Sequence, residues 1–88
     1  METKKVLVTG GNRGIGKGIV EGFLDNGNEV LATCRDVSKF PFENDKLTVA
    51  ELDISDVDSV ENFKKTVDDF GPEILVNNAG ITKDNIFL

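Results

Sequence analysis

Four glycines fall within nine residues in the segment VTGGNRGIG, residues 8–16. They directly follow an apolar run and directly precede a segment whose apolar residues recur at helical spacing. Glycine loses more backbone entropy than other residues when it is fixed, so such a cluster indicates that something passes close to the main chain. The free N–H groups and the dipole at a helix start bind negative charge. We therefore expect a phosphate-binding turn, with an ordinary tight turn as the alternative.

Three glycines of this turn have expected roles. Gly10 and Gly14 allow the tight turn and the approach of a diphosphate, and Gly16 lets the helix pack close to the sheet. A second turn, NNAG at residues 77–80, also follows an apolar run. Because ligands of open α/β sheets bind beyond the carboxyl ends of the strands, the two turns should face each other across one crevice.

The elements that must position these turns alternate between strand and helix. Apolar runs at residues 6–8, 30–32, 47–52 and 74–76 indicate four strands. Such runs are typical of a parallel sheet with helices on both faces. The expected fold class is α/β: a Rossmann-type doubly wound parallel sheet of about four strands in the order 3-2-1-4.

Two segments have helical spacing. The first helix should end at Asn26 and Gly27, and the second should be capped by Ser55 and end at Gly71 and Pro72. Residues 36–45 are expected to form a loop with room for at most one or two helical turns. The predicted apolar stripes comprise Ile15, Ile19, Val20, Phe23 and Leu24 in the first helix, and Val57, Val60, Phe63, Val67 and Phe70 in the second.

Composition limits the possible functions. The 88 residues suffice for one small domain, and the net charge of -6 argues against a nucleic-acid or anionic membrane surface. No stretch approaches a bilayer span, and the N-terminus leads straight into a strand without a signal peptide, so we expect a soluble cytoplasmic protein. Cys34 is the only cysteine and histidine is absent, which disfavours disulfide and metal chemistry.

Two motifs resemble those of a known family. Residues 9–16, TGGNRGIG, match the T-G-x-x-x-G-x-G fingerprint of short-chain dehydrogenases/reductases, and residues 77–80 match the N-N-A-G signature of that family. The run ILVNNAGITKDNIFL, residues 74–88, looks especially like bacterial 3-oxoacyl-[acyl-carrier-protein] reductases. The resemblance covers nearly the whole chain. It is weakest at residues 36–45, where this sequence is shorter than expected.

The resemblance implies positions for a nicotinamide dinucleotide. Asn77 would tie neighbouring strands together. The Asp53 carboxylate would accept from the adenine amino group, although Asp53 reads equally as an acid at a helix start beside Ser55. The implied cofactor-binding residues are Gly10, Gly11, Asn12, Arg13, Gly14, Ile15 and Gly16 at the diphosphate and adjoining ribose, Asp53 and Ile54 at the adenine, and Asn78, Ala79 and Gly80 beside the nicotinamide-side ribose.

The end of the second strand favours NADP. An acid there binds the ribose 2'-hydroxyl of NAD, whereas arginine accommodates the 2'-phosphate of NADP. Family alignment puts the uncharged Cys34 at the discriminating position, and Arg35 and Arg13 can converge on one phosphate. Asp36 is the evidence against NADP, unless it points into the following loop. A solvated surface charge is the alternative for Arg35, and Cys34 is most simply a small apolar filler.

The family uses a serine, a tyrosine and a lysine for catalysis, and this sequence contains no tyrosine. Residues 1–88 are therefore expected to be the cofactor-binding part of a short-chain reductase that lacks the catalytic half and is inactive alone. The intact enzyme would reduce 3-oxoacyl thioesters in fatty acid synthesis. A stand-alone nucleotide-binding or assembly module without catalysis is the alternative.

Assembly into a homo-oligomer is also expected. The strand at residues 74–76 would lie at one edge of the sheet and contains no proline or lysine. An apolar edge strand exposes backbone groups that pair readily with a similar strand. We therefore expect association through this strand and residues 82–88, against a loosely folded monomer kept soluble by its charge.

Overall fold

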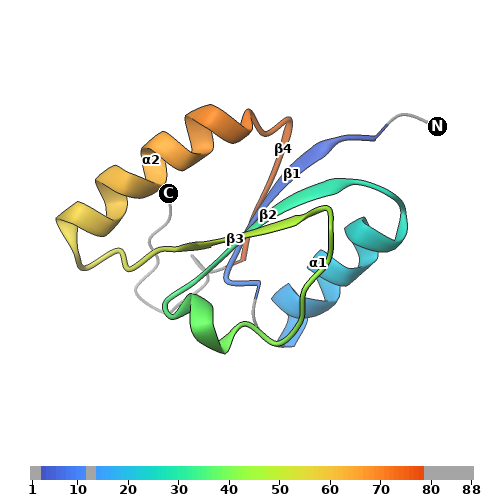
Figure 1. The fold of residues 1–88 in the computed structure, drawn as a ribbon, viewed down its shortest axis with the longest axis horizontal. Coiled ribbons are helices and arrows are strands. Elements are labelled where there is room, and N and C mark those ends of the chain that lie inside the picture. The colour runs from blue at the N-terminus through green and yellow to red at the C-terminus, as the bar shows by residue number, and fades with distance from the viewer. Residues whose placement is uncertain (1–2, 12–13, 79–88) are drawn as a thin grey trace.

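The computed structural model describes residues 3–11 and 14–78 of the chain. None of the helices in these two ranges is long and apolar enough to cross a membrane. The elements in chain order are β1 (Lys5–Thr9), α1 (Gly14–Asp25), β2 (Glu29–Cys34), the short 3₁₀ helix η1 (Val37–Lys39), β3 (Leu47–Glu51), α2 (Val57–Phe70) and β4 (Ile74–Asn77) (Figure 1).

The four strands form one parallel sheet in the order β3-β2-β1-β4. Leu7 of β1 lies opposite Leu31 of β2 on one side and opposite Leu75 of β4 on the other. The predicted doubly wound sheet and its strand order are confirmed. In the described part of the sheet β4 is an edge strand, and Leu75 is 53% exposed.

Alternate residues of the central strands pack on opposite faces of the sheet. Val6 and Val8 contribute to a buried cluster with Val20 of α1. Leu7 between them belongs to a second cluster with Leu31 and with Phe63 of α2. Because successive strand side chains point to opposite faces, α1 and α2 cover opposite sides of the sheet (Figure 1).

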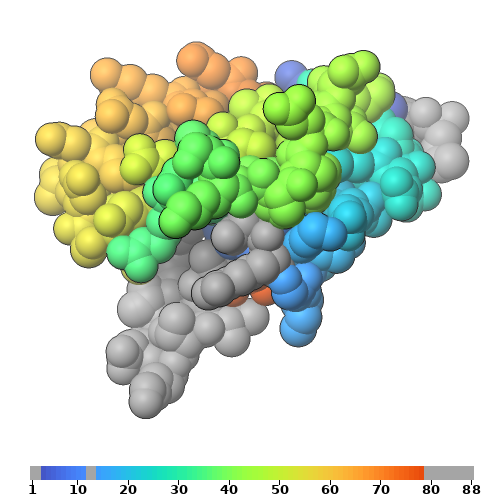
Figure 2. Space-filling model, turned by 60° about the horizontal axis from the view of Figure 1, so that its bottom comes forward, coloured from blue at the N-terminus to red at the C-terminus, as the bar shows by residue number. Residues whose placement is uncertain are grey.

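The connection between β2 and β3 carries only one turn of 3₁₀ helix, at Val37–Lys39. Phe40 and Phe42 of this connection pack against the same cluster as α1, with their ring centroids 5.2 Å apart. The Lys17 Nζ atom of α1 lies 5.6 Å from the centroid of the Phe42 ring. Figure 2 shows the connection, in green, lying against α1, in blue. Two aromatic side chains thus help to cover this face of the sheet.

Two residues of the predicted apolar stripes do not face the core. Ile15 is 79% exposed and Val57 is 75% exposed. Ile15 is the second residue of α1 and Val57 is the first of α2. Helical side chains lean toward the N-terminus, so at these positions there is no preceding helical turn beneath them. The stripe prediction is wrong for these two first-turn positions.

The cap of α2 also differs from the prediction. The N-cap is Asp56, whose carboxylate accepts hydrogen bonds from the N–H groups of Asp58 and Ser59. Ser55 instead donates its hydroxyl to the Asp53 carboxylate. Both residue types cap helices well, so type alone could not decide between adjacent positions. The predicted stop is confirmed, because Gly71 ends α2 with φ 66°.

Replacing Asp56 with alanine should lower the free energy of unfolding by about 1 kcal/mol, because two N–H groups lose their acceptor. Urea denaturation followed by far-ultraviolet circular dichroism measures the change. Ser55→Ala is the matched control and should cost about 0.5 kcal/mol or less, since surface changes away from a cap are small. A larger loss in the serine variant would show that Ser55 is the effective cap.

Candidate functional site

The glycine turn joins β1 to α1 at the carboxyl end of the sheet. Gly10 has φ 70° and Gly14 has φ 60°. Both values lie in the left-handed region, which residues with a Cβ atom rarely adopt. The predicted sharp bend is therefore present, and it depends on these two glycines.

Two further glycines allow close packing around the turn. A Cβ atom at Gly16 would overlap the Gly10 carbonyl oxygen and lie 2.6 Å from Asn78 Nδ2. A Cβ atom at Gly11 would lie 2.8 Å from Val20 Cγ2. The predicted close approach of the helix at Gly16 is confirmed. This approach brings α1, the turn and the residue after β4 together.

Hydrogen bonds hold the Gly10 peptide from two neighbouring elements. The Gly10 N–H donates to Thr33 Oγ1 at 2.9 Å, and the Gly11 N–H donates to the Thr33 carbonyl at 3.0 Å. From beyond β4, Asn78 Nδ2 donates to the Gly10 carbonyl at 3.1 Å. Sequence reasoning missed Thr33, a polar residue that follows the apolar run at residues 30–32 of β2 and whose side chain is only 2% exposed. A hydroxyl-bearing residue directly after an apolar run could have indicated a buried hydrogen bond to the neighbouring turn.

The second turn begins where β4 ends. Thr9 Oγ1 of β1 donates to Asn77 Oδ1 at 3.1 Å, so Asn77 ties the two neighbouring strands together as predicted. Asn78 lies next to the glycine turn through its bond to Gly10. Four of the predicted site residues, Asn12, Arg13, Ala79 and Gly80, lie outside the described residues.

The start of α1 has the character of an anion site. Apart from its chain neighbours and its own helix, no described residue lies within 4 Å of the place where a Cβ atom of residue 14 would be, and the first turn of α1 contains no acidic residue. The first four N–H groups of a helix have no partner within the helix, and their dipole favours negative charge. Open space therefore lies next to the positive end of the α1 dipole. These features suit the diphosphate of a dinucleotide.

The end of β2 places its three polar residues in different surroundings. Cys34 is buried, and burial raises the pKa of its thiol. The Arg35 side chain is 81% exposed. Asp36 turns into the following loop, as predicted, where its carboxylate accepts from the Ser38 N–H at 3.0 Å and the Ser38 hydroxyl at 2.6 Å. Of these three residues, Arg35 alone presents a positive charge, and its side chain is open to solvent.

Asp53 has the helix-start arrangement considered from the sequence and, in addition, an approach to Arg35 that was not predicted. Its Oδ1 atom accepts from the Ser55 hydroxyl at 2.6 Å and from the Ser55 N–H at 3.0 Å, the geometry of an acid before a helix. Its Oδ2 atom lies 3.9 Å from Arg35 Nη2. The bonds from Ser55, and to a lesser degree the Arg35 guanidinium, lower the pKa of the Asp53 carboxyl. Ile54 beside it is 62% exposed.

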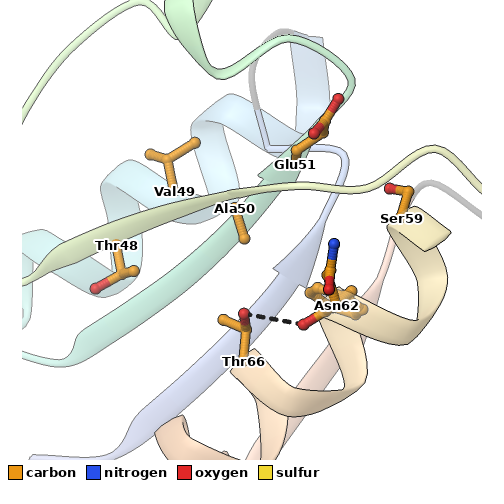
Figure 3. Close-up of a pocket in the computed structure, with 8 residues that line it drawn as sticks. Thr48, Val49, Ala50, Glu51, Ser59, Asn62 and Thr66 are labelled. Atoms are coloured by element: carbon orange, nitrogen blue, oxygen red, sulfur yellow. Dashed lines mark hydrogen bonds between the residues drawn. The ribbon is translucent and has the colours of Figure 1, made fainter.

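A separate hollow of about 330 Å³ lies between β3 and α2 (Figure 3). Residues 48–51 of β3 form one wall, and Ser59, Asn62, Phe63 and Thr66 of α2 form the other. Thr66 Oγ1 donates to the Asn62 carbonyl at 3.3 Å, a bond within the helix. The hollow contains none of the predicted site residues. It is distinct from the glycine turn.

Comparison with known proteins places the chain among oxidoreductase sequences. A family model described as short chain dehydrogenase matches residues 4–88. The chain is 40% identical over 96 residues to the 3-oxoacyl-[acyl-carrier-protein] reductase FabG of Vibrio harveyi, covering 100% of this chain and 38% of that reductase. The chain therefore spans less than half the length of this relative.

Solved structures share the fold of the chain. A short-chain dehydrogenase from Burkholderia cenocepacia in complex with NADP has a TM-score of 0.80 and 30% identity, covering 93% of this chain and 34% of that one. A 4-hydroxyisoleucine dehydrogenase complexed with NADH has a TM-score of 0.74 and 28% identity, covering 90% of this chain and 35% of that one. The two similar proteins thus hold different nicotinamide dinucleotides.

Proposed function

Because the chain belongs to the short-chain dehydrogenase family, we propose that its residues 1–88 are the dinucleotide-binding part of an NADPH-dependent oxidoreductase. One observation carries the proposal: the open, positively polarised start of α1 lies beside the carboxyl end of β2, where Arg35 is exposed. A diphosphate and a 2'-phosphate need donors at these two places.

The chain's own residues would bind and orient the cofactor. The first-turn N–H groups of α1 would hold the diphosphate, with Gly14 leaving room for it. When bound, a nicotinamide supplies or accepts a hydride. The proposed cofactor contacts are those implied by the sequence: Gly10, Gly11, Asn12, Arg13, Gly14, Ile15 and Gly16 at the diphosphate and adjoining ribose, Arg35 at the 2'-phosphate, Asp53 and Ile54 at the adenine, and Asn78, Ala79 and Gly80 at the second ribose.

The choice of NADPH rests on Arg35. Its guanidinium is exposed, and its Nη2 atom lies 3.9 Å from the Asp53 carboxylate. An exposed pair at this distance contributes little free energy, so a phosphate can compete for the guanidinium. The Asp36 carboxylate keeps its negative charge, but its bonds from Ser38 direct it into the following loop.

The similarity to 3-oxoacyl reductases supports a substrate class for the intact enzyme. We propose that the whole protein reduces 3-oxoacyl thioesters in the cytosol, as part of fatty acid synthesis. The family's proton-transferring residue is a tyrosine, and the 88 residues contain none. We therefore propose that this chain alone binds cofactor without reducing such thioesters.

Calorimetry with the 88-residue chain tests the binding proposal. NADPH should bind at least about tenfold more tightly than NADH, because hydrogen bonds to a charged group contribute roughly 1.5 to 3 kcal/mol. The same sample should oxidise no NADPH above the buffer background when acetoacetyl-CoA is added. Equal affinity for the two dinucleotides would contradict the choice of NADPH. Oxidation of NADPH that depends on the thioester would contradict the proposal that the 88-residue chain lacks catalytic activity.

A further inference from the structure

We propose that Thr33 is the positioning residue of the glycine turn, fixing the Gly10 and Gly11 peptides so that the start of α1 faces a bound diphosphate. This inference rests on the proposed function, since it assigns a role within the same dinucleotide site. Thr33 would not touch the cofactor. It would act through the backbone of the turn.

β1 leaves the sheet at the point where its regular pairing with β2 ends. The ladder between β1 and β2 ends at the pair Val8 and Ala32. Beyond this pair, the next two N–H groups of the turn donate to Thr33: Gly10 to the side-chain hydroxyl at 2.9 Å and Gly11 to the carbonyl at 3.0 Å. One residue of β2 therefore continues the pairing after the regular ladder has stopped.

The bonds to Thr33 determine which backbone N–H groups remain available to bind an anion. Because the N–H groups of Gly10 and Gly11 point to Thr33, they serve the fold and not a phosphate. Gly10 and Gly11 then contribute shape to the cofactor contact without donating N–H groups, and the donors to a diphosphate come from the first turn of α1. Thr33 thereby separates the structural N–H groups from the binding ones.

Contacts from several elements hold Gly10 in place. Its carbonyl accepts from Asn78 Nδ2 at 3.1 Å and packs against Gly16 of α1. With the Gly10 N–H on Thr33, residue Gly10 is held by β2, by the residue after β4 and by α1 together. A displaced Gly10 would therefore move the start of α1. Thr33 is the member of this group whose side-chain donor or acceptor can be removed with little change of shape.

Thr33→Val removes the hydroxyl and keeps the branched shape, whereas Thr33→Ser keeps the hydroxyl. Thr66→Val is the matched control, because Thr66 loses a similar hydroxyl from α2, far along the chain from the turn. Two measurements are needed on all four forms of the 88-residue chain: amide hydrogen exchange of Gly10 by NMR, and affinity for NADPH and NADH by NMR titration.

In the wild type and in Thr33→Ser, the Gly10 amide should exchange slowly. In Thr33→Val it should exchange faster, and affinity should fall about tenfold for both dinucleotides, because leaving a donor unsatisfied costs on the order of one tenfold step. The equal loss is the distinguishing sign, since NADPH and NADH share the diphosphate. Thr66→Val should change neither measurement.

Several results would overturn the inference. Rapid exchange of the Gly10 amide in the wild type would overturn it. This test needs no variant, so it holds even if Thr33→Val fails to fold. Unchanged affinity in a folded Thr33→Val protein would refute the positioning role while wild-type binding upheld the proposed function. If no form bound either dinucleotide, the proposed function would fail and the positioning role with it, although slow Gly10 exchange would still report the hydrogen bond.

Discussion

Replacing Gly16 with alanine is expected to destabilise the fold by roughly 3 kcal/mol, at the upper end of the cost of overpacking. The added Cβ atom would overlap the Gly10 carbonyl oxygen and lie 2.6 Å from Asn78 Nδ2. Backbone atoms held by Thr33 and Asn78 cannot move aside as a flexible side chain could. The start of α1 would have to shift, so dinucleotide affinity should fall as well. Urea denaturation measures the loss of stability.

Gly18 provides a matched control on the same helix. Outside its own helix, no residue in the described ranges lies within 4 Å of the position where its Cβ atom would be. Gly18→Ala should therefore raise the free energy of unfolding by about 0.5 to 1 kcal/mol, the difference in helix propensity between the two residues. The two alanines should act with opposite sign. A Gly16→Ala protein as stable as Gly18→Ala would mean that α1 does not lie against the turn.

Replacing Arg35 with alanine is expected to abolish the preference for NADPH. The loss should be roughly 1.5 to 3 kcal/mol of binding free energy for NADPH, since the guanidinium bonds to a doubly charged phosphate. Affinity for NADH should stay nearly the same, because that cofactor has no 2'-phosphate. Calorimetry with both cofactors gives the ratio. Stability should hardly change, because the ion pair with Asp53 is exposed and long, at 3.9 Å.

Lys39→Ala is the control for a general charge effect. Lys39 lies in the same connection as Arg35, on η1, and is also exposed. Its loss removes the same net charge, so any drop in NADPH affinity from long-range attraction alone should appear in both variants. An equal drop in both would show that Arg35 is a solvated surface charge and that the cofactor preference has another source.

The sheet could be predicted from the sequence because its signals are local. The apolar runs around Val8 and Leu31 mark strands buried on both faces, the run around Val76 marks the edge strand, and the turn residues Gly27 and Gly71 mark the helix ends. Strand order followed from the crossover pattern of such folds. That Asn77 ties neighbouring strands together could also be predicted, on the resemblance of the NNAG turn to a known family, and the structure shows that its partner is Thr9.

The details of the site could not be predicted, because they depend on distances between elements. Nothing in the sequence shows that the Thr33 hydroxyl reaches Gly10, 23 residues away, or that Arg35 and Asp53 approach each other. The cap at Asp56 is a choice between adjacent residues of similar capping ability. The exposure of Ile15 depends on where a helix begins, which periodicity defines only loosely.

The crossover between β2 and β3, at residues 35–46, closes its face of the sheet with the rings of Phe40 and Phe42. The entropy lost in closing a loop grows with its length, so a short link restricts the chain less than a longer one would. The link contains a single turn of 3₁₀ helix, so it has fewer helical backbone hydrogen bonds than a full α-helix would have. The crossover is therefore fastened mainly by side-chain burial, an attachment that weakens on cooling, whereas a hydrogen-bonded helix does not depend on hydration in this way.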